Sequence, residues 1–95
     1  MEKMKPNKFT QACINGDIKT VKQLIDSVDP SAEGNEALRD AAFNGHLEVV
    51  KYLCSLPVKY GIDPSACQNA AIGGAAMMGH LHVVKYICDL LLDRE

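Results

Sequence analysis

Two ten-residue stretches of the chain are nearly identical. Residues 44–53 read NGHLEVVKYL and residues 78–87 read MGHLHVVKYI, so seven of ten positions match at a spacing of 34 residues. The tetrapeptide DPSA occurs at 29–32 and again at 63–66, which is the same spacing. A catalytic motif seldom needs a copy of itself, whereas a period of about 20–50 residues is typical of arrays of stacked units. The repeat therefore predicts a stack of similar units that share one core.

Three copies of the unit align on three glycines, Gly16, Gly45 and Gly79. In each copy two small residues, alanine or cysteine, stand three and four positions before the glycine. Small side chains at one place in every unit let neighbouring helices approach closely and build a continuous core. In register, the copies read ACINGDIKTVKQLI at 12–25, AAFNGHLEVVKYLC at 41–54 and AAMMGHLHVVKYIC at 75–88.

Each copy predicts two helices joined by a tight turn. In the middle copy, Asn35 is expected to cap a first helix that runs to about Phe43, because its side-chain oxygen can accept an amide of the first turn. Gly45 ends that helix, since glycine accepts the left-handed conformation found at helix ends. A second helix with one apolar face is expected over about 47–55. The chain is therefore expected to be all-α.

The sequence AAFNGHLEVVKYL resembles the ankyrin repeat motif A-A-x-x-G-H-x-x-x-V-x-x-L, and DPSA is similar to the D-x-N-A element that opens the next unit in that family. The resemblance covers about residues 8–92. It implies an ankyrin-repeat solenoid of about three stacked helix-turn-helix units in a single domain, residues 1–95. The repeats are expected at about 7–34, 35–68 and 69–95.

Two features depart from the family pattern. The usual T-P-L-H opening of the first helix is absent, with EALR at 36–39 and AAIG at 70–73 in its place. The segment from DPSA to the first helix is also shorter than usual. In the family this segment forms a projecting β-turn that often touches partners. The first helices and their C-terminal ends therefore become the expected binding surface.

The resemblance implies a non-enzymatic module that binds another protein. Ile14, Phe43 and Met77 stand two positions before the three glycines, and this position faces the concave groove in ankyrin arrays. Aromatic and methionine side chains there suit partner binding, while packing between units is the alternative. The residues expected to contact a partner are Ile14, Arg39, Asp40, Phe43, Asn44, Met77 and Met78.

No pattern in the sequence favours catalysis, a cofactor or a metal site. His46 and His80 occupy the glycine-histidine position of the repeat, where a structural hydrogen bond is expected, and His82 is expected on the outward face. The spacing of histidines and cysteines does not resemble a zinc site. Gly73-Gly74 lacks the frame of a phosphate-binding loop. We therefore expect no catalytic residues, no metal and no cofactor.

Charge and hydropathy limit the partners and the location. The net charge is −2, which argues against nucleic acid as a partner. No apolar stretch is long enough to span a membrane, and no secretory signal is visible, so a cytoplasmic location is expected, with the nucleus as the alternative. Lys22, Lys51 and Lys85 align on the second helices, where a solvated convex face is expected.

The four cysteines are Cys13, Cys54, Cys67 and Cys88. An even number can form disulfides in a secreted chain. Without a signal sequence or a CxxC pair, reduced thiols are favoured. Cys54 and Cys88 occupy equivalent positions in two copies and are expected on buried helix faces, where thiols are inert.

The last copy ends in three consecutive leucines, Leu90, Leu91 and Leu92. An array needs a polar outer face on its terminal units, and burying all three leucines within this chain looks difficult. Three explanations are open: a longer array of which this chain is a fragment, a makeshift cap, or two chains that stack end to end. The alternative to a groove-binding module is therefore a self-associating or fragmentary structural array that uses these leucines, with a homodimer formed through the C-terminal end as one form of it.

Overall fold

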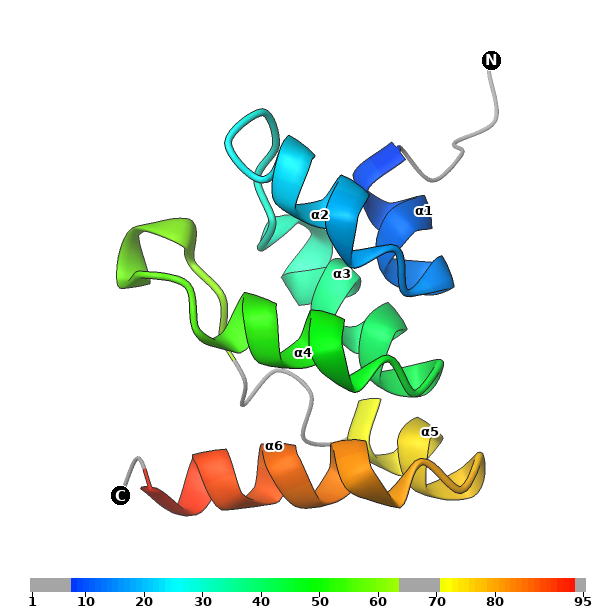
Figure 1. Ribbon diagram of the computed structural model, residues 1–95. Helices are drawn as coiled ribbons and strands as arrows, with labels where there is room; N and C mark the ends of the chain where they lie inside the picture. Colours follow the sequence, from blue (N-terminus) through cyan, green and yellow to red (C-terminus); the bar gives the residue numbers. More distant parts are fainter. Residues whose placement is uncertain (1–7, 64–70, 94–95) are drawn as a thin grey trace.

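Three helix pairs form the fold, stacked one on another from the N-terminal to the C-terminal end of the chain (Figure 1). The computed structural model describes residues 8–63 and 71–93, and within these ranges it is all-α, as predicted. The first helix of each pair lies beside the first helix of the next, and the second helices form a parallel row. The elements are α1 (Lys8–Asn15), α2 (Ile18–Leu24), α3 (Ala32–Phe43), α4 (Leu47–Cys54), the 3-10 turn η1 (Val58–Tyr60), α5 (Ala71–Met77) and α6 (Leu81–Asp93).

The turns between paired helices are built on the predicted glycines. Gly45 has a φ of 77° and lies between the end of α3 and the start of α4. A residue with a side chain would pay roughly 1–2 kcal/mol for this left-handed conformation. The amide of His46 donates to the carbonyl of Ala41 at 2.9 Å, which closes the turn. The second helix of the middle unit, predicted over about 47–55, is confirmed as Leu47–Cys54.

The small residues before the glycines lie where the helix pairs meet. Ala41 and Ala42 are completely buried in α3, and Cys13 is completely buried in α1. Larger apolar side chains from both rows, such as Leu38 and Leu53, fill the space around them and are also completely buried. A single apolar cluster therefore runs through all three pairs, as the repeat predicted.

The predicted cap at Asn35 is wrong. Glu33, Gly34 and Asn35 have φ values of 57°, 63° and 66°, so they interrupt α3 just before its regular part. The side-chain oxygen of Asn35 instead accepts the backbone amide of Asp63 at 3.0 Å, 28 residues along the chain. The backbone amide of Asp63, at the start of the next unit, thus takes the side-chain oxygen that was expected to cap the helix. The side chain thus ties neighbouring units together.

The connection that follows α4 runs over the surface of the molecule. It contains η1, where Val58 is 95% exposed. The hydroxyl of Tyr60 donates to the Oδ1 atom of Asp26 at 2.6 Å, and this hydrogen bond raises the pKa of Tyr60. This hydrogen bond attaches the connection to the end of the first unit, which is distant from it in sequence.

Along the chain stretches that the structure describes, no helix has both the length and the apolar character needed to cross a membrane. The longest helix, α6, has 13 residues. It extends beyond the position at which α4 ends, because Leu91 is half-buried and packs against the core. Leu90 is also half-buried, and Leu92 is 67% exposed. Self-association through these leucines stays a prediction.

Candidate functional site

Exposed apolar side chains gather where the first helices end. Phe43 at the end of α3 is 45% exposed, and Met77 at the end of α5 is 87% exposed. Met78, which follows α5, is 57% exposed, and Ile14 near the end of α1 is half-buried. Because α1, α3 and α5 lie side by side, these residues share one edge of the stack. We call this edge, with Arg39, Asp40 and Asn44 of the middle unit, the groove face.

The polar residues of the groove face are partly engaged in holding α3. Arg39 donates from Nε to the carbonyl of Gly34 at 3.1 Å and from Nη2 to that of Glu33 at 2.8 Å. The Nδ2 atom of Asn44 donates to the carbonyl of Asp40 at 2.8 Å. Arg39 therefore stabilises the left-handed segment before α3, and Asn44 caps the helix end. The sequence did not reveal either role, because both acceptors are backbone carbonyls.

Asp40 differs from its neighbours because its carboxyl is half-buried. Burial is the main cause that raises the pKa of Asp40, and the nearby carboxylate of Glu36 raises it further, while Arg39 opposes the shift. The Cys13 thiol lies near Asp40, and its pKa is raised to about 12 by burial first and by the carboxylate of Asp40 second, so this thiol stays protonated. Among residues 8–63 and 71–93, no three His, Cys, Asp or Glu side chains come together as a metal site would require.

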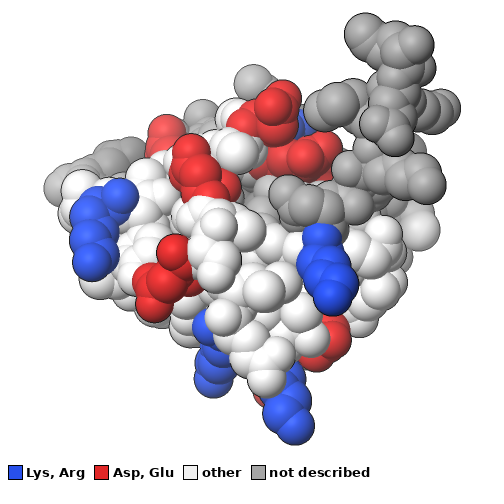
Figure 2. Space-filling view, turned by 90° about the horizontal axis from the view of Figure 1, so that it is seen from above, with Lys and Arg blue, Asp and Glu red and all other residues white. Residues whose placement is uncertain are grey.

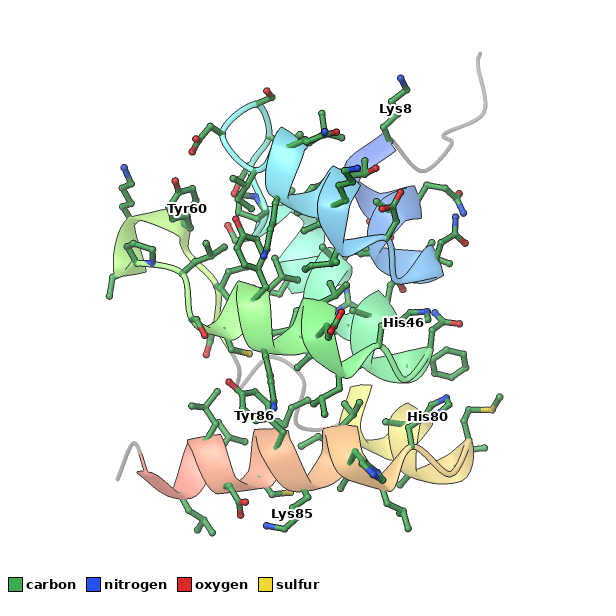
Figure 3. All side chains as sticks on the ribbon, in the orientation of Figure 1. Lys8, His46, Tyr60, His80, Lys85 and Tyr86 are labelled. Carbon is green, nitrogen blue, oxygen red and sulfur yellow. The ribbon has the colours of Figure 1, made fainter. Side chains whose placement is uncertain are left out.

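The two glycine-histidine positions join each unit to the one before it. The Nε2 atom of His46 donates to the carbonyl of Ile14 at 2.9 Å, so the expected structural hydrogen bond is confirmed there. The ring lies so close to Gly16 that a Cβ atom at this glycine would be 2.8 Å from its Cγ atom. The ring of His80 takes the same place on Gly45, where the distance would be 2.7 Å (Figure 3).

Two of the three aligned lysines, Lys22 and Lys51, also reach the neighbouring unit. Nζ of Lys22 lies 5.5 Å from the centre of the Tyr52 ring, and Nζ of Lys51 lies 5.7 Å from that of Tyr86. Such contacts at exposed sites contribute about 0.5–1 kcal/mol. Burial raises the pKa of Tyr86, which is half-buried between α4 and α6. The lysines are exposed, as predicted, but their contact with tyrosines of the next unit was not foreseen.

The outer row of helices carries a shallow, mainly apolar hollow between α4 and α6, with a volume of about 460 Å³. Seen from the α1–α2 end, the basic side chains stand at separate places on the molecule (Figure 2). That view shows no broad basic surface on this face. The hollow is lined by Leu47, Lys51, Leu81, His82, Lys85, Tyr86 and Asp89.

The expectation that Cys54 and Cys88 both lie on buried faces is wrong for Cys88. Cys88 is exposed and Cys54 is half-buried, while Cys13 is buried. The difference arises because, among the residues that the structure describes, no helix lies on the side of α6 that faces away from α4. Cys67 lies outside the described residues.

Iodoacetamide is expected to label Cys88 in the folded chain and to leave Cys13 unmodified. Burial is the main cause that raises the pKa of Cys13 to about 12, so its thiol stays protonated and shielded at about pH 8. Mass spectrometry of the labelled peptides measures both sites. In denaturant both cysteines should react, and equal labelling of the two in the folded chain would show that the first pair opens readily.

The comparison with known families decides the identity. The family described as ankyrin repeats, in three copies, matches residues 5–67, which is more than half of the chain. The chain belongs to the ankyrin repeat family. Ankyrin repeats are generally protein–protein interaction modules and are typically non-enzymatic. No curated protein and no solved structure matches the chain significantly. The family match ends before α5, but α5 and α6 continue the stack with the same glycine-histidine contact.

Proposed function

We propose that this ankyrin chain is a non-enzymatic module that binds another protein through its groove face. The observation that carries the proposal is the exposure of Phe43, Met77 and Met78 at the ends of adjacent helices. Leaving such side chains in water forgoes up to roughly 1.5–3 kcal/mol each of burial free energy. Aromatic and methionine side chains are also enriched where proteins meet. A partner that offers apolar side chains to this edge would recover that free energy.

The half-buried Asp40 adds a polar contact to the same edge. Its carboxyl lies one turn before Asn44 on α3, beside the exposed ring of Phe43. A partner with a basic or amide side chain next to an apolar one would fit this combination. Such a partner would be a protein segment, since the face offers both an apolar anchor and a single charged acceptor.

The double variant Phe43→Ser, Met77→Ser tests the proposal. Peptides are first selected from a random library on the immobilised wild-type chain, and their dissociation constants are then measured by fluorescence polarisation. Because a few central side chains dominate binding, the double variant is expected to weaken it by about tenfold or more. Both side chains are exposed, so circular dichroism should show an intact fold.

The matched control is Val58→Ser, Leu92→Ser, which removes two exposed apolar side chains outside the groove face. This variant should bind the selected peptides as the wild type does. If the control loses binding and the groove variant keeps it, the binding surface lies elsewhere. If the groove variant unfolds, Phe43 and Met77 serve packing between units, which was the alternative interpretation of their position.

A further inference from the structure

The hollow between α4 and α6 has the features of a second binding site. Two described helices form its walls, with Leu47 and Lys51 of α4 on one side and Leu81 of α6 on the other. Its volume of about 460 Å³ lies within the range of roughly 300–1,000 Å³ that is usual for binding sites. The hollow belongs to the second helices, so it is separate from the groove face, which lies where the first helices end.

The apolar surface of the hollow is formed by Leu47, Leu81 and Tyr86. Leu47 and Leu81 are the first residues of α4 and α6, two neighbouring helices that run in parallel. Leu81 is 66% exposed, while Leu47 and Tyr86 are half-buried. The ring of Tyr86 lies between the two helices (Figure 3). An apolar side chain of a partner would meet apolar surface on both sides of the hollow, and burial of that surface favours binding.

The hollow also carries a positive charge that no carboxylate offsets. Nζ of Lys51 lies 5.7 Å from the centre of the Tyr86 ring, and no carboxylate of the described residues lies within ion-pair distance of it. Lys85 and Asp89 pair with each other at 2.9 Å, so their opposite charges offset one another. Lys51 is therefore the charge that an acidic group of a partner can neutralise, and it stands beside the apolar surface of the hollow.

The corresponding place between α2 and α4 differs in charge. A lysine lies over a tyrosine there as well, since Nζ of Lys22 is 5.5 Å from the centre of the Tyr52 ring. Glu48, however, stands at the position of α4 that His82 occupies on α6, three residues after the turn glycine. The carboxylate of Glu48 would repel an acidic partner, and such like-charge contacts exclude partners. An acidic segment would therefore select the hollow between α4 and α6.

From these observations we propose that the hollow binds an acidic amphipathic helix of a partner protein. An apolar side chain of that helix would pack between Leu47 and Leu81, and a carboxylate one turn away would pair with Lys51. A helix fits better than an extended segment, because the backbone groups of α4 and α6 are bonded within their own helices and cannot pair with a strand. The proposal does not depend on the groove face.

The probe is a fluorescent synthetic peptide of about 15 residues, with leucine at every third or fourth position and glutamate or alanine elsewhere. A second peptide has lysine in place of each glutamate. Fluorescence polarisation should show that the wild type binds the acidic peptide at least about tenfold more tightly than the basic one. The net charge of the chain is −2, so attraction by the overall charge would favour the basic peptide instead. Equal affinities, or no binding of the acidic peptide, overturn the proposal.

The variant Lys51→Glu and its matched control Lys22→Glu locate the contact. Both make the same change in charge and remove the same kind of contact with a tyrosine ring, but only Lys51 lines the hollow. Lys51→Glu should weaken binding of the acidic peptide at least about tenfold, because the new carboxylate repels the probe. Lys22→Glu should weaken it by less than about threefold, since salt screens the more distant charge. Equal weakening by the two variants would mean that only net charge matters, which overturns the proposal.

A measurement on the wild type applies if Lys51→Glu does not fold. In NMR spectra of the chain with labelled leucine methyl groups, the acidic peptide should shift the signals of Leu47 and Leu81 and leave that of Leu24 in α2 unchanged. Shifts at Leu24 alone overturn the proposal. Dodecanoate is the probe for a small anionic amphiphile. If it shifts Leu47 and Leu81 while the acidic peptide does not, the occupant is a small molecule and the proposal is wrong.

The groove variant Phe43→Ser, Met77→Ser separates this proposal from the proposed function. It leaves the hollow intact and should bind the acidic peptide as the wild type does. If the groove variant loses the acidic peptide and Lys51→Glu keeps it, the peptide lies on the groove face. That result overturns the proposal for the hollow and leaves the proposed function standing.

Discussion

Replacing Leu38 by alanine is expected to lower the free energy of unfolding by about 2–5 kcal/mol. Leu38 is completely buried in α3, the helix that packs against α1, α4 and α5. The substitution removes apolar contacts and leaves a cavity in the apolar cluster. A chain of this length is typically stable by only about 5–14 kcal/mol, so the loss is a large part of the total. Urea unfolding followed by circular dichroism measures it.

The matched control for this prediction is Leu81→Ala, which makes the same chemical change at a side chain that is 66% exposed. Surface substitutions of this kind usually change stability by less than about 0.5 kcal/mol. We therefore expect the midpoint of the control to stay close to that of the wild type. Similar losses for both variants would contradict the view that α3 organises the core.

The architecture was predictable because it depends on local signals that recur. Three local signals predict a helix or its end without reference to distant residues. They are the turn glycines, the small residues before them and the helical periodicity of the apolar side chains. Gly45 and the helix Leu47–Cys54 show this directly. The fixed spacing then implied that the pairs stack in order, which the structure confirms.

The features that sequence reasoning missed depend on contacts between units. Asn35 bonds to Asp63 rather than to its own helix, and Lys51 lies over Tyr86 rather than in free solvent. Neither partner is near in sequence, so helix-capping and periodicity rules could not select them. The wrong expectation for Cys88 has the same origin, because its equivalent Ile25 is buried, while no described helix covers the outer side of α6.

The groove face was found from sequence only in part. Phe43 and Met77 are exposed at adjacent helix ends, which fits the expected surface, but the partner contacts themselves are still a prediction. Arg39 is held by two carbonyls and is less available to a partner than its position implied.

Gly45→Ala and Gly79→Ala form a pair that measures how strongly one unit is held by the next. Both glycines have the same left-handed backbone, with φ values of 77° and 80°. Each variant should therefore lose roughly 1–2 kcal/mol from backbone strain alone. Only at Gly45 does the new methyl group meet a histidine ring, that of His80. Displacing this ring should lower the free energy of unfolding by about a further 1–3 kcal/mol, as overpacking does in protein cores.

Urea unfolding of both variants, alone and combined with His80→Ala, separates the two contributions. In the His80→Ala background the obstacle is gone, so Gly45→Ala should cost no more than Gly79→Ala does in the natural chain. The excess loss in the presence of His80 is then the coupling free energy between the second and third units. If the two glycine variants lose the same stability in every background, the ring of His80 does not hold the units together. The stack would then depend on apolar packing alone.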